Sequence, residues 1–224
     1  VEHYAIHKPL HTSTTYGYTD TRELIDVFQG KPGYTYARQG NPTTAALEAK
    51  ITMMEAGVAT ACFATGMAAI MAVFSTMLRA GDHVVSSAFL FGNTNSVFET
   101  LRNLGVEVTF VDATSAQAVA DAVQPNTRLV FVETIANPRT QVADLKGIGD
   151  VCKARGLIYV VDSTMTSPWL FRARDAQASL VVHSLSKYIG GHGNALGGAV
   201  VDTGLFDWAA YPNIYPAYRK AKPE

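Results

Sequence analysis

From residue 41 onward, short apolar runs alternate with segments of helical pattern, and this alternation leaves few architectures open to the chain. Strands separated by helices imply a mainly parallel sheet with helices on both faces, an α/β fold. About seven strands are predicted, at residues 58–63, 83–86, 106–111, 129–132, 157–162, 180–183 and 198–201. Helices are predicted at residues 42–55, 66–78, 93–104, 116–123 and 146–155, the first with Asn41 as its N-cap and Pro42 as its first residue.

Residues 1–45 differ in character and are predicted to form an extended N-terminal arm. They are rich in Tyr, Thr and Gly, and only residues 21–29 have the pattern of a short helix. Such a segment has too few apolar residues to bury itself, so we expect it to lie on another surface. Residues 46–224 form the predicted α/β domain, which ends without a closing element. We therefore expect the chain to be part of a longer protein.

The composition indicates a globular protein with one sizeable core. The chain has 224 residues, is 48% hydrophobic and carries a net charge of −1, with both signs mixed along its length. The sequence has no basic stripe that would indicate binding to nucleic acid or to a membrane surface. Its longest apolar stretch, residues 67–78, is too short to span a bilayer. The polar N-terminus predicts no signal peptide, and the two cysteines lie in apparent core elements. We expect a cytoplasmic, soluble protein.

A carboxylate and an amine follow two neighbouring predicted strands. Asp162 ends the strand 157–162, and Lys187 comes just after the strand 180–183, beyond two hydroxyl residues, Ser184 and Ser186. In open α/β sheets, ligands bind at the carboxyl ends of the strands. A lysine imine to pyridoxal phosphate (PLP), a carboxylate on the ring nitrogen and hydroxyls on the phosphate would suit this pattern. Alone, Asp162 would more often be a helix cap and Lys187 a surface residue; the apolar neighbours of Lys187 predict partial burial.

Three further loops reach the same predicted edge. Gly66 and Met67 open a helix after a strand, where their backbone N–H groups could bind a phosphate, although a plain strand–helix turn is equally open. Asn137, in an Asn-Pro pair, could approach the phenolic oxygen of a ring cofactor, but such a pair more often marks a turn. Phe91 could stack on a cofactor ring, and a buried aromatic is the simpler alternative.

In the arm, Tyr36 and Arg38 are two residues apart on what is predicted to be an extended segment, so they would point to one side and suit a phosphate. Solvated arm residues are the alternative. The histidines and cysteines form no HExxH or CxxC pattern, which predicts no metal site. There is no GxxxxGK[ST] and no GxGxxG at a strand–helix junction, so phosphate-loop and nicotinamide sites are not supported.

Taken together, these segments resemble the cysteine/methionine-metabolism family of PLP-dependent enzymes, of fold type I. That family includes cystathionine γ-synthase, the O-acyl-homoserine sulfhydrylases, the cystathionine lyases and methionine γ-lyase. The resemblance runs from about Tyr18 to the end of the chain. It rests on YAR at 36–38, GNPT at 40–43, TGMAA at 65–69, NP at 137–138, VD at 161–162 and HSLSKYIGGH at 183–192.

The resemblance implies PLP as cofactor and a role for each candidate residue. Lys187 would form the imine, Asp162 would pair with the pyridinium nitrogen, and Asn137 would approach the phenolic oxygen. Phosphate binding is implied for four residues of the same subunit, Gly66, Met67, Ser184 and Ser186. Tyr36 and Arg38 would bind the phosphate of a neighbouring subunit, so the resemblance implies a homodimer or a homotetramer with shared sites.

Where the family usually has tyrosine at the stacking position, this chain has Phe91, a pattern similar to that of some sulfhydrylases. This favours γ-replacement on an O-acyl-L-homoserine by a thiol or sulfide. A cystathionine or methionine γ-lyase is the alternative, and a non-catalytic PLP-binding or assembly subunit is a third hypothesis. The family's small C-terminal domain, which carries the arginine for the substrate carboxylate, has no counterpart in these residues.

Overall fold

The computed structural model describes residue 6 and residues 9–214. These residues divide into two compact units, which we describe separately. The N-terminal unit ends at Lys50, and the α/β unit runs from Ile51 to Ile214. The boundary falls inside helix α2 (Pro42–Glu55).

The N-terminal unit has little regular structure besides helix α1 (Thr21–Phe28) and the first turns of α2. A single antiparallel bridge joins Thr15 to Tyr36. The side chain of Asn41 accepts a hydrogen bond of 2.8 Å from the backbone N–H of Thr43, so the predicted N-cap of α2 is confirmed.

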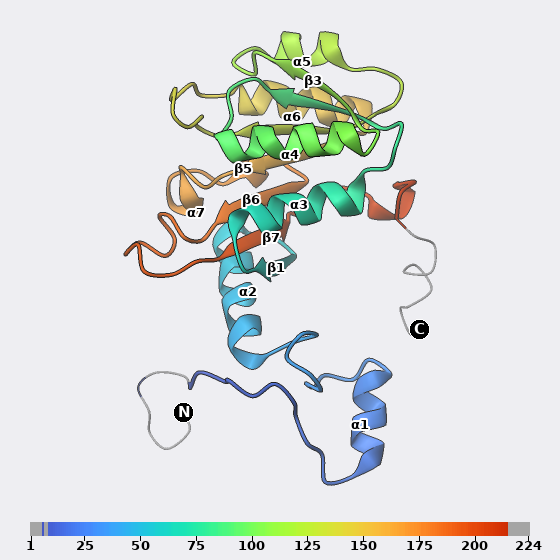
Figure 1. Ribbon diagram of the computed structural model, residues 1–224, viewed down its shortest axis with the longest axis vertical. Coiled ribbons are helices and arrows are strands. Elements are labelled where there is room, and N and C mark those ends of the chain that lie inside the picture. Colours follow the sequence, from blue (N-terminus) through green and yellow to red (C-terminus); the bar gives the residue numbers. More distant parts are fainter. Residues whose placement is uncertain (1–5, 7–8, 215–224) are drawn as a thin grey trace. The chain divides into compact units, whose positions relative to one another are not determined.

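The α/β unit is built on a seven-stranded sheet with the order β1-β7-β6-β5-β4-β2-β3 (Figure 1). Its strands are β1 (Ala59–Phe63), β2 (His83–Ser87), β3 (Glu107–Val111), β4 (Thr127–Glu133), β5 (Ile158–Asp162), β6 (Leu180–Ser184) and β7 (Gly198–Asp202). Strands β3, β2, β4, β5 and β6 pair in parallel, whereas β7 is antiparallel to both of its neighbours. The mainly parallel sheet that the sequence predicts is therefore confirmed.

Helices cover both faces of this sheet (Figure 1). Their bounds are α3 (Gly66–Met77), α4 (Gly92–Asn103), α5 (Ala116–Ala122) and α6 (Leu145–Arg155). Helices α3 and α4 pack on one face around Phe74, Phe98 and Phe131, with ring centroids 5.0 Å apart for Phe74–Phe98 and 5.4 Å for Phe74–Phe131. On the other face, α5 and α6 contribute Val119 and Ile148 to a second apolar cluster. Two buried faces explain the apolar character of the central strands.

The predicted strands and helices are present, with ends that differ by one or two residues. The sequence did not predict α7 (Ser167–Leu170), η2 (Ala173–Ala176) or η3 (Trp208–Ala210), which are too short to show a helical period. Among the described residues, no helix is both long and apolar enough to cross a bilayer.

A buried acid–histidine pair joins the end of α2 to the sheet. Oε1 of Glu55 lies 2.5 Å from Nε2 of His183 on β6, and both side chains are 0% exposed. Their remaining polar atoms, Oε2 of Glu55 and Nδ1 of His183, have no hydrogen-bond partner among the described residues. Each side chain therefore depends on the other to offset its desolvation.

We expect Glu55→Ala to lower the free energy of unfolding by about 3–5 kcal/mol, because it leaves His183 buried without a partner. Glu55→Gln keeps a hydrogen-bonding group of the same size and should cost clearly less. Urea unfolding measures both, with the exposed Glu107→Ala as control. A Glu55→Ala variant as stable as the control would contradict a role for the pair in stability.

Candidate active site

One cavity of about 600 Å³ lies at the edge where β1, β4, β5 and β6 end. Its volume falls within the range of about 300–1,000 Å³ that is common for small-molecule sites. All of the candidate residues that belong to the α/β unit line it, namely Gly66, Met67, Phe91, Asn137, Asp162, Ser184, Ser186 and Lys187. The structure thus brings together residues that the sequence places on five separate loops.

The N-terminus of α3 supplies free hydrogen-bond donors to this cavity. Oγ1 of Thr65 accepts from the Ala68 N–H (3.0 Å), and the Thr65 carbonyl accepts from the Ala69 N–H (3.1 Å). The amides of Gly66 and Met67 have no acceptor among the described residues. Such first-turn amides, at the positive end of a helix dipole, form an anion site.

Two glycines let α3 approach the ends of β6 and β7. A Cβ atom on Gly66 would lie 2.7 Å from Cβ and 2.9 Å from Cα of Ser184, and one on Gly198 would overlap the carbonyl group of Thr65. Glycine at position 66 is thus required by the neighbouring strand, in addition to the close phosphate approach inferred from the sequence.

Asp162 ends β5 at the floor of the cavity. Its Oδ1 accepts a hydrogen bond of 2.9 Å from the backbone N–H of Thr164. Burial raises the pKa of Asp162 above its usual value, while the hydrogen bonds from Thr164 and the nearby His183 act in the opposite direction. A cationic group bound next to this carboxylate would therefore be stabilised by it, and would stabilise its charged form.

Lys187 lies in the turn that follows β6 and is exposed, so the predicted partial burial is wrong. The chain leaves the sheet after Ser184 and turns tightly, with the Gly190 N–H donating to the Leu185 carbonyl (2.8 Å) and the Gly191 N–H to that of Lys187 (2.8 Å). Lys187 is thus an exposed residue on a turn, and it lines the cavity.

The two candidate serines lie next to this turn: Ser184 is the last residue of β6, and Ser186 directly precedes Lys187. The backbone N–H of Ser184 donates to Oγ1 of Thr164 (2.8 Å), which fixes the end of β6 against the loop after β5. Oγ of Ser186 accepts from the Gly197 N–H (3.1 Å) and so faces the return strand. Both serines line the cavity, and the hydroxyl of Ser186 donates to the Gly197 carbonyl (3.4 Å).

A carboxylate that the sequence analysis missed lies between Phe91 and Asn137. Oε1 of Glu133 accepts from the Phe91 N–H (2.7 Å), and Oε2 accepts from the Asn137 N–H (3.3 Å). Glu133 is only 7% exposed, and burial raises its pKa to about 7. Its position at the end of a buried strand, four residues before Asn137, was the available signal.

Other lining residues were not named as candidates, although Thr65, Tyr188 and Gly191 lie in the motifs quoted above. They are Thr65, Ile70, Thr94, Ile135, Thr164, Met165, Tyr188, Gly191, Gly193 and Leu196. Thr94 is notable since it is 1% exposed and its Oγ1 has no partner among the described residues. Its hydroxyl is available to a ligand.

Tyr36 and Arg38 belong to the N-terminal unit. The guanidinium carbon of Arg38 lies 4.7 Å from the centroid of the Tyr36 ring, so the two side chains stack. The extended segment predicted here is wrong, since the N–H of Gln39 donates to the Tyr36 carbonyl (2.9 Å) and closes a turn. The pairing of the two side chains arises from this turn and from the cation–π contact.

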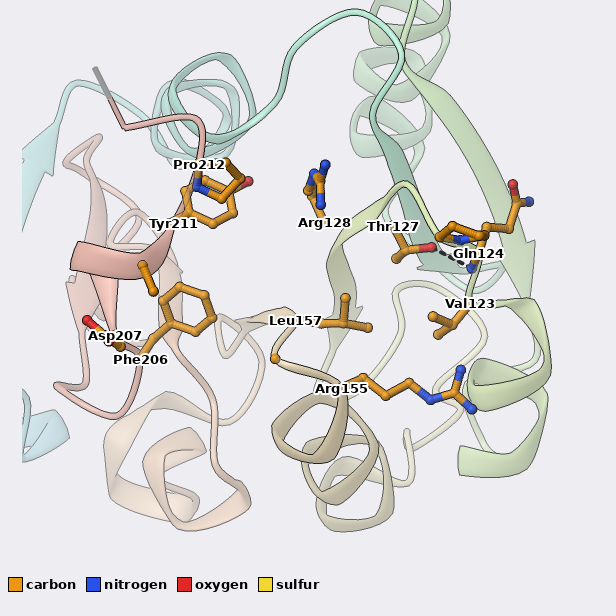
Figure 2. Close-up of a pocket in the computed structure, with 13 residues that line it drawn as sticks. Val123, Gln124, Thr127, Arg128, Arg155, Leu157, Phe206, Asp207, Tyr211 and Pro212 are labelled. Atoms are coloured by element: carbon orange, nitrogen blue, oxygen red, sulfur yellow. Dashed lines mark hydrogen bonds between the residues drawn. The ribbon is translucent and has the colours of Figure 1, made fainter. Parts of the chain in front are cut away.

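A second, smaller cavity of about 250 Å³ lies at the opposite edge, where β4 and β5 begin. Figure 2 shows Arg128 and Arg155 on one side and Phe206 and Tyr211 on the other. Arg128 is engaged by Asp82, with Nε 3.1 Å from Oδ1. This cavity shares no lining residue with the larger one.

An amine, a carboxylate and free helix amides at the carboxyl edge of a mainly parallel sheet are typical of PLP-dependent enzymes of fold type I. Fold and site together define that class. The family follows from the sequence: residues 2–217 match the profile described as "Cys/Met metabolism PLP-dependent enzyme". The chain therefore belongs to this PLP-dependent family, as the motifs predicted.

Named relatives include both replacement and elimination enzymes. The chain is 35% identical over 218 residues to homocysteine synthase of Schizosaccharomyces pombe, which covers 96% of this chain and 51% of that protein. It is 42% identical over 170 residues to cystathionine gamma-lyase of Bacillus subtilis, covering 75% and 45%, respectively. The chain thus spans about half the length of the curated relatives it matches.

Solved structures agree with the fold. A Campylobacter jejuni protein, provisionally assigned as an O-acetylhomoserine (thiol)-lyase, matches with a TM-score of 0.83 and 30% identity, over 88% of this chain and 49% of that one. That structure contains a pyridoxyl-lysine monophosphate residue. A lysine-linked PLP is therefore found in a close fold relative.

Gly66→Ala should destabilise the α/β unit by about 1–3 kcal/mol, since the new methyl group overlaps Ser184. It should also weaken PLP binding, because α3 must move away from the cavity. Urea unfolding and a PLP titration measure the two effects. Gly92→Ala is a matched control at another helix start, where a Cβ meets nothing within 4 Å; equal effects in both variants would disprove the packing argument.

Proposed function

We propose that this chain provides the PLP-binding part of an enzyme that replaces the γ-substituent of an O-acyl-L-homoserine with a thiol or sulfide. One observation supports this above all: Lys187, Asp162 and the N-terminus of α3 line the same cavity. The similarity to a homocysteine synthase over nearly the whole chain supports the choice of reaction.

The groups around the cavity suit PLP. The free amides of Gly66 and Met67 are donors for its phosphate, to which Ser184 and Ser186 would add hydroxyls. A protonated ring nitrogen next to Asp162 would supply the positive charge that this buried carboxylate lacks, and would oppose the rise in its pKa.

In the proposed mechanism, the cofactor supplies an electron sink for the substrate α-carbon. Lys187 would hold the cofactor through Nζ, and once the substrate amine had taken its place, the free amine of Lys187 would be the base for the α-proton. Asp162 would keep the ring nitrogen of the cofactor protonated. Once it has given up the α-proton, Lys187 would take one from Cβ, which would allow the acyl group to leave Cγ as a carboxylate. The sulfur nucleophile would then add at Cγ, and protons would return to Cβ and Cα.

Phe91 would stack on the cofactor ring, and its exposed fraction of 41% leaves a face available for this. A phenyl ring cannot accept or donate a proton, so this position takes no part in acid–base steps. Among the described residues that line the cavity, Lys187 is the one with a side-chain amine, and it would carry out these acid–base steps. Asn137 would contact the phenolic oxygen of the cofactor.

A γ-lyase acting on cystathionine or methionine is the second candidate, favoured by the 42% identity to a cystathionine gamma-lyase. Elimination and replacement share their first steps, so the same residues serve both. A non-catalytic PLP-binding or assembly subunit is the third, and the intact Asp162–Lys187 combination speaks against it. Amino-acid substrate and thiol or sulfide are the proposed partners.

We further propose that the active protein is a homodimer or homotetramer, in which Tyr36 and Arg38 bind the PLP phosphate of a neighbouring subunit. The stacked arrangement of the two side chains supports this, because it holds the guanidinium group in one orientation.

The purified protein should show a visible PLP band and should form homocysteine from O-acetyl-L-homoserine only when sulfide is added. Keto acid and ammonia formed regardless of sulfide would instead establish a lyase. Lys187→Ala is the control: it should lose the covalently held cofactor and about 10²–10⁴-fold or more of the activity, the range for a general base. Full activity of this variant would contradict the mechanism.

Arg38→Ala should weaken PLP retention by about 1.5–3 kcal/mol if the guanidinium group makes a charge-assisted bond to the phosphate. The PLP dissociation constant, measured by absorbance during dialysis, tests this. Arg22→Ala, on the exposed surface of α1, is the control from the same unit. Unchanged PLP affinity in the Arg38 variant would exclude the N-terminal unit from the site.

A further inference from the structure

Glu133 is a buried carboxylate that the mechanism above does not use. It ends β4, lines the cavity, and is paired in register with Asp162 on β5. Burial and the charge of Asp162 both raise its pKa, which reaches about 7. A second acid so close to Asp162 is costly, and this cost calls for a function.

The two oxygens of Glu133 are each used by a different loop. Oε1 accepts from the N–H of Phe91, which is 42 residues away in the sequence, at 2.7 Å. Oε2 accepts from the N–H of Asn137 at 3.3 Å. One carboxylate thus connects the loop after β2 with the loop after β4.

The start of α4 explains why a carboxylate is stable there. Phe91 is the N-cap residue of this helix and provides no side-chain cap. The carboxylate of Glu133 lies at this uncapped end, where the helix dipole and the free N–H favour negative charge. The two N–H bonds lower the pKa of Glu133 against the effect of burial.

Because both oxygens already accept backbone N–H groups, Glu133 is poorly placed to take a proton from a substrate. We infer that Glu133 is a positioning residue. Its carboxylate holds the backbone at Phe91 and at Asn137, and so fixes the points from which the Phe91 ring and the Asn137 amide side chain extend. This inference rests on the proposed PLP function, since those two side chains are the ones assigned to the cofactor ring and its phenolic oxygen.

Two substitutions separate this role from a general effect on stability. Glu133→Gln keeps the size and one carbonyl oxygen, so the stronger bond to Phe91 survives, while an NH₂ group meets the N–H of Asn137. Glu133→Asp keeps the charge but is one methylene shorter, so it cannot reach both amides. Glu107→Gln, at the exposed start of β3, is the control.

The experiment measures amide hydrogen exchange by NMR in the PLP-free proteins, and PLP affinity by titration. In Glu133→Gln, exchange at Asn137 should rise about tenfold or more while Phe91 stays protected; in Glu133→Asp, at least one of the two should rise by the same factor. PLP affinity should fall about tenfold in both variants and stay unchanged in Glu107→Gln.

The inference would be overturned if both Glu133 variants kept the wild-type exchange rates at Phe91 and Asn137 and the wild-type PLP affinity. A uniform rise in exchange rate across the whole α/β unit would also overturn it. If neither variant folds, the wild-type apoprotein decides: slow exchange at Phe91 and Asn137 supports the shared contact, and exchange at the rate of unstructured amides refutes it. A wild type that binds no PLP would contradict the proposed function, whereas the amide exchange still tests the contact itself.

Discussion

The site depends on the parallel register of β4, β5 and β6. Glu133 is paired with Asp162, and Asp162 with Val182, so the three strands end at nearly the same level. Parallel strands present their carboxyl ends at one edge, and the loops that follow them meet there. Asp162 and Lys187 line one cavity for this reason, and the amides at the start of α3, which follows β1, line it as well.

The antiparallel strand β7 completes this edge. It returns from the turn after Lys187 and brings Gly198 against the Thr65 carbonyl, where no Cβ could fit. The N-terminus of α3 is thereby held close to Ser184, and its free amides are fixed relative to the lysine turn. The exposed turn that carries Lys187 is thus attached to strands that are buried on both faces of the sheet.

Much of the fold, and two of the residues in the candidate site, could be predicted from the sequence. The order of apolar runs and helices gave the sheet, and Asp162 and Lys187 were found because each directly follows a predicted strand. The direction of β7 was not predictable, because the local sequence of a strand carries no signal for its orientation. The burial of Lys187 was misjudged since apolar neighbours on a tight turn need not enclose the side chain.

Glu133 was not predicted as a site residue from the sequence, because its contact with Phe91 forms only in the folded chain. This contact holds the backbone of Phe91, not its ring. A bond to the backbone N–H does not depend on which ring residue 91 carries, so a phenylalanine can make it where the family usually has tyrosine. What changes is the acid–base chemistry on that face, which leaves Lys187 to carry the proton transfers of the proposed reaction.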